Sequence, residues 1–487
     1  FYTVGKLPTD KEFKGVEDVP EPFKVTRFKD IIGFLIGPAI ISVSVGIGTG
    51  EVISGPLAIL SYGPTILWFA LLSIFLQTVS AIAGTRYTMA TGEPLINGIS
   101  RLWLGKKVWA IIWTVSDFVR LMWPYYMVLT GTTFAYIALG RPPEAPEQYL
   151  VGALGVVGLL IGIAPLLFGE KIQKTLGWLS WWDVVVEVGI IVIITLLIVP
   201  ANVLFEVFSG FFAFGSLPAG VNWAIIAAIA GYAGNYAANA IAMTNYYRDT
   251  EWGMTKKTGF IPAVVGGKVV PFLSKGYMPK TDPENVRRYN GWMKYVHLEQ
   301  WVVFFFGSFV TMWFPVALAY HLVPRGAKIP SGWAFPVALA NYMPIPALVV
   351  LMTILLLALY ITNTVTVVDM LPREFTNIWW TAFPSLEKRF KGDAKKLYYT
   401  ILAVLSLIWV ILMFVGVQPA WQAVLAGAFA NLIGVFCYIG LLGVNFVLLP
   451  KPYRMKWWEI FVIIVGLVFY SIIFVAFVLN NFFGIKI

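Results

Sequence analysis

Gly46-Ile47-Gly48-Thr49-Gly50-Glu51 interrupts an apolar stretch that runs from residue 31 to residue 62. Three glycines at alternate positions weaken a helix, because glycine loses more backbone freedom on folding than other residues do. The last residue adds a carboxyl group near the middle of a segment long enough to cross a bilayer. A second interruption, Gly231-Tyr232-Ala233-Gly234-Asn235, lies in the apolar stretch 222–247. The fold prediction depends on these two polar interruptions.

The composition indicates a protein that is surrounded by lipid. Of the 487 residues, 59% are hydrophobic and 12% are charged, so a soluble domain would lack the polar side chains to cover its surface. Crossing a bilayer takes about 20 apolar residues of helix, and lipid leaves unpaired backbone groups without partners. The chain is therefore predicted to be an all-α, multi-pass membrane protein with eleven transmembrane helices. In chain order, spans 1 to 11 are predicted at residues 31–62, 64–84, 108–139, 150–168, 177–199, 222–247, 299–321, 346–368, 397–416, 420–448 and 457–481.

The lysines and arginines favour one orientation of these spans. With the N-terminus in the cytoplasm, 30 of the 35 lie in segments that face the cytoplasm, as the positive-inside rule predicts. A wrong number of spans would invert the later loops and remove this asymmetry. The net charge of +10 therefore indicates orientation and not a nucleic-acid partner. We expect a plasma-membrane protein with lipid as its main partner, a cytoplasmic N-terminus and an external C-terminus.

The two interruptions lie five spans apart, which is the spacing that two inverted repeats of five helices predict. In such proteins the first helix of each repeat unwinds, and its free carbonyl groups bind substrate near the middle of the membrane. The alternative is that the glycines only allow close packing of helices. We predict a cytoplasmic tail at 1–30, a first repeat at 31–199, a second repeat at 200–448 and an eleventh helix within 449–487.

Two long cytoplasmic loops are also predicted, at residues 248–298 and 369–396. The first is basic and rich in glycine and proline. The second is expected to contain a short amphipathic helix around residues 383–390, lying on the inner surface of the membrane.

Several short segments resemble a known family of transporters. Gly37-Pro38, Ser61-Tyr62-Gly63 and Leu67-Trp68, around the first interruption, are similar to the start of Nramp-type (natural resistance-associated macrophage protein) transporters. The second interruption resembles helix 6 of divergent Nramp-like proteins. The matching segments further along the chain are Tyr247-Arg248-Asp249, Gly253-Met254, Asn445, Leu449-Pro450 and Arg454. The resemblance implies a LeuT-type fold of two inverted repeats plus one extra helix, with helices 1 and 6 broken, and a role in transport.

The chain also departs from the metal-transporting members of that family. Their Asp-Pro-Gly-Asn break matches Gly48-Thr49-Gly50-Glu51 here, so the aspartate is lost and the asparagine is an acid. Their helix 6 supplies a methionine and a nearby histidine, whereas Met243 lies well beyond the second interruption. A thioether favours soft transition metals, and oxygen ligands suit hard cations or polar organic solutes. The resemblance therefore does not imply manganese or iron transport.

The predicted substrate site lies between the two interruptions. Glu51 would neutralise a cation or a substrate amine and is the one candidate metal ligand. Asn235 and Asn239 would form hydrogen bonds, and the backbone carbonyls of the interruptions would coordinate. The candidate substrate-binding residues are Gly46, Gly48, Thr49, Glu51, Gly231, Tyr232, Gly234, Asn235, Asn239 and Gln422.

Ionisable and hydroxyl groups in other spans are candidates for coupling-ion binding. Asp117 and Arg120 lie three residues apart and could neutralise each other, although the resemblance implies that Arg120 replaces an acid on a proton route. Asp183 and Glu187 are close enough to share a proton, with snorkelling of Glu187 as the alternative. Hydroxyls of residues 362–366 could bind sodium, or could bond to carbonyls of their own helix. The candidate coupling-ion residues are Thr362, Asn363, Thr366, Asp117, Arg120 and Glu187.

These features favour a secondary active transporter that moves a cation, with divalent metals among the candidates, by alternating access coupled to protons or sodium. The first alternative is a sodium-coupled transporter of a small amino-acid-like solute. The second is a membrane subunit that keeps the fold without transporting, in which Arg120 forms an ion pair across a collapsed cavity. No catalytic or cofactor motif is present in the sequence, so we expect no enzyme activity and no cofactor other than a bound cation.

Overall fold

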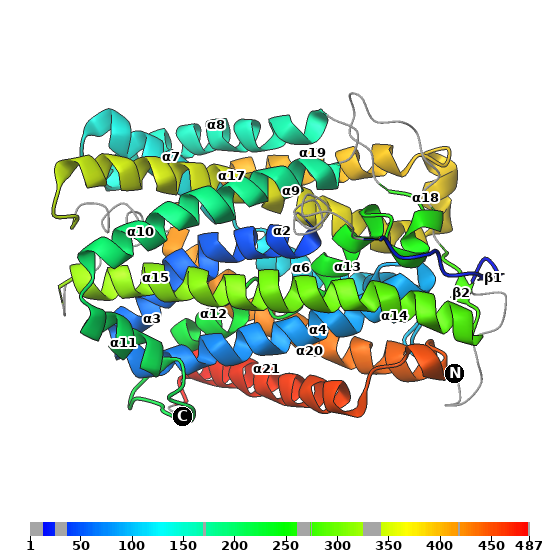
Figure 1. The fold of residues 1–487 in the computed structure, drawn as a ribbon. Coiled ribbons are helices and arrows are strands. Elements are labelled where there is room, and N and C mark those ends of the chain that lie inside the picture. Colours follow the sequence, from blue (N-terminus) through cyan, green and yellow to red (C-terminus); the bar gives the residue numbers. More distant parts are fainter. Residues whose placement is uncertain are drawn as a thin grey trace.

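The computed structural model describes residues 13–24, 37–168, 172–260, 273, 275–324, 342–416 and 419–485. In this part of the chain, nine helical segments are long and apolar enough to cross a membrane. They coincide with nine of the eleven predicted spans, and the other two, spans 3 and 6, are present as interrupted helices. The chain is a multi-pass helical membrane protein, with its helices side by side in one bundle (Figure 1).

Most spans consist of more than one helical element. Spans 1 to 5 are α2, η1 and α3 (Pro38–Gly46, Ile47–Ser54 and Gly55–Tyr62); η2 and α4 (Pro64–Leu67 and Trp68–Thr91); α6 and α7 (Lys106–Leu121 and Tyr125–Leu139); η3 and α8 (Ala145–Glu147 and Gln148–Leu167); and α9, η4 and α10 (Ile172–Trp182, Asp183–Glu187 and Val188–Ile198). Spans 6 to 11 are α12 and α13 (Trp223–Tyr232 and Asn239–Asp249); α14, η6 and α15 (Pro283–Leu298, Glu299–Phe306 and Gly307–Leu322); α17 (Pro346–Ala382); α19 (Ala394–Met413); α20 (Pro419–Val447); and α21 (Trp457–Phe483).

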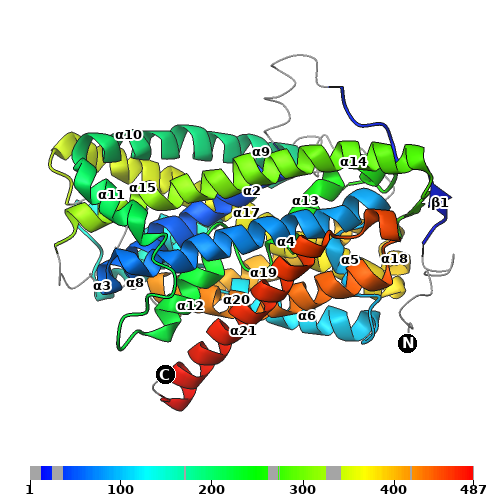
Figure 2. The ribbon, with the colours of Figure 1, turned by 60° about the horizontal axis from the view of Figure 1, so that its bottom comes forward.

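Short elements connect these spans: α5 (Leu95–Ile99), α11 (Ala201–Gly210), η5 (Gly253–Lys257), β2 (Met278–Pro279), α18 (Pro384–Arg389) and η7 (Lys451–Tyr453). The two-residue strand β1 (Val16–Glu17), which precedes span 1, pairs with β2 in parallel. The strand β1 and the end of α21 lie at opposite ends of the bundle, as an odd number of spans requires (Figure 1). In Figure 2, α21 crosses the bundle obliquely, against α20, α12 and α4.

Span 1 occupies the interior of the bundle. Every residue of α2 and η1 is buried, and η1 contacts α12, α15, α17 and α20. Spans 4, 5, 9 and 11 are much less buried and form the outside of the bundle. The interruption at Gly46–Glu51 is therefore surrounded by protein.

The prediction that span 1 unwinds at its interruption is wrong. The span is one continuous helix, and residues Ile47–Ser54 form a π-helical segment in which the Gly55 N–H donates to the Gly50 carbonyl. A π-helix has a wider turn, so it can follow an irregular, glycine-rich sequence without leaving backbone groups unpaired in the membrane.

The predicted break of span 6 is confirmed. The helix ends at Tyr232 and begins again at Asn239, with Gly234 at φ +86° between them. That backbone conformation strains any residue with a side chain, which explains a glycine here. Span 3 contains a second break, at residues 122–124, which we did not predict. Pro124 causes it, because proline has no N–H and keeps the preceding residue out of the helical conformation.

Both predicted cytoplasmic loops are more helical than expected. Span 7 begins at Pro283, sixteen residues before the predicted start, where the Asp282 side chain caps the helix by accepting from the Asn285 N–H at 3.1 Å. Span 8 continues beyond residue 368 to Ala382. The short helix α18 lies where the amphipathic helix was predicted.

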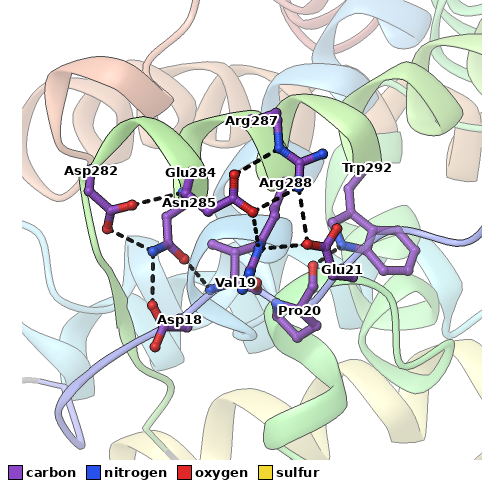
Figure 3. Close-up of polar contacts among 10 residues, drawn as sticks. All are labelled: Asp18, Val19, Pro20, Glu21, Asp282, Glu284, Asn285, Arg287, Arg288 and Trp292. Carbon is purple, nitrogen blue, oxygen red and sulfur yellow. Dashed lines mark hydrogen bonds and ion pairs between the residues drawn. The ribbon is translucent and has the colours of Figure 1, made fainter.

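An N-terminal strap, residues 13–24, lies against the start of span 7 (Figure 3). The Val19 N–H donates to Asn285 Oδ1 at 2.7 Å, and the Trp292 indole donates to the Pro20 carbonyl at 2.8 Å. Asp18 forms an ion pair with Lys280 at 2.8 Å. Hydrogen bonds from Lys280 and then Asn285 hold the pKa of Asp18 below its ordinary value.

Candidate functional site

Glu51 connects the two interruptions. It lies in the π-helical segment of span 1 and is fully buried. Its Oε1 atom accepts a hydrogen bond from the Gly234 N–H, in the break of span 6, at 3.2 Å. Its Oε2 atom has no hydrogen-bond partner in the described part of the chain. One carboxyl oxygen is therefore available to a ligand at the point where the two spans meet.

The glycines of span 1 allow this contact. A Cβ atom at Gly46 would collide with the carbonyl oxygen of Gly234, and one at Gly50 would collide with the carbonyl oxygen of Tyr232. Neither carbonyl oxygen accepts a hydrogen bond from any described residue. The close-packing alternative and the binding-site prediction are thus compatible here, because close packing directs two free carbonyl oxygens at span 1.

Tyr126 is the residue of span 3 that reaches this place. Its hydroxyl is hydrogen-bonded to the Thr49 hydroxyl and donates to the Val45 carbonyl at 3.0 Å. Tyr126 lies in the first turn after the break at Pro124, so the break directs this side chain toward span 1. The sequence analysis did not select Tyr126. Pro124, in the middle of the predicted span, was the available signal, but proline also occurs inside the continuous helices α8 and α15.

The two asparagines of span 6 bind a serine of span 1. The Asn235 amide donates to Ser42 Oγ at 2.6 Å and to Asn239 Oδ1 at 2.9 Å, and Ser42 Oγ donates to Asn239 Oδ1 at 2.5 Å. These contacts tie the break of span 6 to α2. In this conformation the asparagines connect two helices, and no contact joins either of them to Glu51.

Span 10 supports the break of span 6 from the other side. Gly231 packs against the Gly427 carbonyl, and the Asn431 amide donates to the Ala227 carbonyl at 2.9 Å. Gln422 is buried near the start of α20. No contact joins it to Glu51 in the described part of the chain.

Solved structures of membrane transporters are similar to this chain. A manganese transporter from Eremococcus coleocola, in complex with an aromatic bis-isothiourea substituted compound, matches with TM-score 0.63 at 12% identity, over 98% of this chain and 92% of that chain. A mutant of that transporter gives TM-score 0.66 at 13% identity over the same shares. Mhp1, a nucleobase-cation-symport-1 family transporter with bromovinylhydantoin bound, gives TM-score 0.50 at 13% identity, over 91% of this chain and 92% of that chain.

The chain has the LeuT-type fold. The resemblance to Nramp-type transporters is thereby confirmed at the level of the fold. No protein-family model and no curated protein matches the chain.

In this LeuT-type fold, span 8 presents an amide to the interruption of span 1. The Asn363 side chain lies where a Cβ at Gly48 would be, and its Oδ1 atom has no partner among the described residues. The Thr366 hydroxyl donates to the Thr362 carbonyl at 3.1 Å, which matches the alternative of bonding within the helix. Asn363 is therefore the predicted coupling-ion residue that lies nearest to span 1.

Arg120 belongs to a buried polar cluster next to the break of span 6. Its Nε donates to Asp117 Oδ1 at 2.6 Å, and its guanidinium lies 3.9 Å from the centre of the Tyr236 ring. The Tyr236 hydroxyl donates to Glu374 Oε1 at 3.1 Å, which adds a second carboxyl group to the cluster. The mutual neutralisation of Asp117 and Arg120 is thus present. The sequence analysis missed Glu374, because it lies in a stretch predicted to be a loop.

Glu187 does not lie at the interruptions. It ends the π-helical segment η4 of span 5, beside Asp183. Within the described residues, no group of three or more His, Cys, Asp or Glu side chains is placed to hold a metal ion. A cation bound at Glu51 would therefore depend on backbone, hydroxyl and amide oxygens for its other ligands.

Proposed function

We propose that the chain is a secondary active transporter that moves a hard cation across the plasma membrane by alternating access. The observation that supports this most directly is the unpartnered Oε2 atom of Glu51, fully buried in the interior of the bundle. A buried carboxylate without a counter-charge is costly by several kcal/mol, so a bound positive charge would stabilise it.

The surroundings of Glu51 favour a hard cation. The free carbonyl oxygens of Tyr232 and Gly234 and the Thr49 hydroxyl belong to the two interruptions, and the Asn363 amide of span 8 lies against Gly48. Oxygen atoms in this number and variety are typical ligands for alkali and alkaline-earth cations. The thioether that would favour a soft transition metal does not belong to this group of residues.

Alternating access would use the two breaks as hinges. Gly234 and Pro124 lie at the ends of separate half-helices, and rotation at these positions leaves the half-helices intact. The hydrogen bond between Gly234 and Glu51 joins one hinge to the site. A change in the charge or occupancy of Glu51 would therefore be transmitted to span 6.

Uptake into proteoliposomes tests this proposal. We expect the purified protein to accumulate at least one of Mg²⁺, Mn²⁺ and Na⁺, and we expect Glu51→Gln to abolish that uptake. Glu144→Gln, at an exposed loop position, is the control and should transport normally. Uptake of a small amino acid that depends on Glu51, without uptake of a divalent cation, would favour the solute-transporter alternative. No uptake under any gradient would favour the non-transporting subunit and contradict the proposal.

A further inference from the structure

Span 5 carries a pair of carboxyl groups that the site at Glu51 does not use. Asp183 and Glu187 are the first and last residues of η4, and Asp183 is fully buried. The two residues lie four apart in the chain, a spacing that makes their side chains neighbours on one face of span 5. Asp183 Oδ1 and Glu187 Oε2 have no hydrogen-bond partner among the described residues.

Two serines complete this cluster. The Ser44 hydroxyl, from α2 of span 1, donates to Asp183 Oδ2. Ser180 is fully buried one turn before Asp183, on the same side of span 5, and its hydroxyl has no partner in the described part of the chain. Other span hydroxyls, such as that of Thr195, donate to the carbonyl four residues earlier, but that of Ser180 does not. Span 5 thus carries three unpartnered buried polar atoms within eight residues, which indicates that something binds there.

No described basic side chain neutralises the pair. The elements packed against η4 are α2, α9, α10 and α17, and α2 and α10 contain no ionisable residue. Lys174 of α9 is exposed. On α17, Arg373 binds Asp369 and Asp249. Glu374 belongs to the cluster with Arg120, and Tyr360 carries no charge.

We propose that Asp183 and Glu187 share one proton, with Ser44 donating to the pair, and that this pair is the proton-coupling site of the transporter. Two carboxyl groups on neighbouring positions of a helix, away from water, cannot both be ionised without a large cost, and a proton is the one cation small enough to lie between them. Binding forms one O–H bond and needs no other reactant. Ser44 lies in the helix that also carries Glu51, so movement of span 1 would change the donor to Asp183.

Infrared spectroscopy tests proton binding without any transport assay. We expect a protonated carboxyl C=O band at neutral pH that shifts when the aspartate and glutamate carboxyls carry ¹³C. Asp183→Asn and Glu187→Gln should each remove a component of the band that Glu51→Gln retains. If these variants fail to fold, Ser44→Ala keeps both carboxyls and should shift the band. A band that is unchanged in all three variants would overturn the proposal, as would loss of the wild-type component on addition of Na⁺.

Transport tests the coupling role, which rests on the proposed function. An inward proton gradient should stimulate cation uptake by the wild type about tenfold, a typical coupling factor, and should not stimulate uptake by Asp183→Asn. Cation binding at Glu51 should persist in that variant, which separates loss of coupling from loss of the cation site. Equal stimulation of both proteins would overturn the coupling role. If the protonated carboxyl band is present but the protein transports nothing under any gradient, the proposed function is contradicted while the proton site stands.

Discussion

Gly46, Gly48 and Gly50 face four different partners: two backbone carbonyls of span 6, and the side chains of Asn363 and Tyr126. Each glycine lets span 1 approach a neighbour at a distance that a side chain would prevent. At the scale of residues, the site therefore depends on missing Cβ atoms as much as on the Glu51 carboxyl group.

Substitution of Gly50 tests this dependence. A Cβ at Gly50 would collide with the Tyr232 carbonyl, so Gly50→Ala should separate spans 1 and 6 and lower the free energy of unfolding by about 1–3 kcal/mol. Gly189→Ala is the control, because Gly189 lies in span 5 with open space around it, and should be neutral or stabilising. Thermal unfolding in detergent measures both. Equal stability of the two variants would contradict the close approach of spans 1 and 6.

At the scale of elements, the hydropathy pattern locates the spans but not their ends. Residues 369–382, which include Asp369 and Arg373, were predicted to be part of a loop, yet they continue span 8. The two side chains form an ion pair at 2.8 Å inside the protein, so neither has to reach water. Pairing between residues far apart along the chain, such as Glu374 and Tyr236, cannot be recognised in one sequence, and for this reason Glu374 was missed.

Breaks in helices were predicted with mixed success. The break of span 6 could be predicted because glycine and asparagine occur together within an apolar stretch. The break of span 3 depends on Pro124 alone, and a single proline is tolerated inside α8 and α15 of this same protein. The π-helical form of span 1 depends on packing against span 6, and glycine spacing does not distinguish it from an unwound segment.

The N-terminal strap gives a prediction at the same scale. Asn285→Ala removes the acceptor of the Val19 N–H, so the amide hydrogen of Val19 should exchange faster. The free energy of protection should fall by about 1–3 kcal/mol. Hydrogen exchange followed by mass spectrometry measures this over residues 13–24. Asn290→Ala, at an exposed position of the same helix, should leave the exchange unchanged. Equal protection in both variants would mean that Asn285 does not hold the strap.

At the scale of the whole molecule, buried ion pairs gather where the predicted cytoplasmic loops meet the bundle. Arg86 of span 2 binds Glu459 of span 11 at 2.7 Å, and Arg373 of span 8 binds Asp249 of span 6. Such pairs connect distant spans, and breaking one by removing a single partner leaves an uncompensated charge. Some arginines at this end of the bundle therefore hold spans together inside the protein, in addition to the effect of the basic residues on orientation.

The orientation itself can be measured with introduced cysteines. Cys437, the single native cysteine, is buried, so Cys437→Ala provides a background without thiols. In intact cells, a membrane-impermeant maleimide should label Glu144→Cys, and it should label Lys391→Cys only after permeabilisation, because the positive-inside rule places residue 391 in the cytoplasm. Labelling of Lys391→Cys, but not of Glu144→Cys, in intact cells would contradict the predicted topology.

Cation binding to purified protein, measured by calorimetry for the wild type and Glu51→Gln, tests the central claim most directly. We predict that the wild type binds one equivalent of a hard cation and that Glu51→Gln binds it at least about 100-fold more weakly, the consequence of removing the charge from a buried ligand set. Equal affinity of the two proteins for every cation that binds would contradict the account.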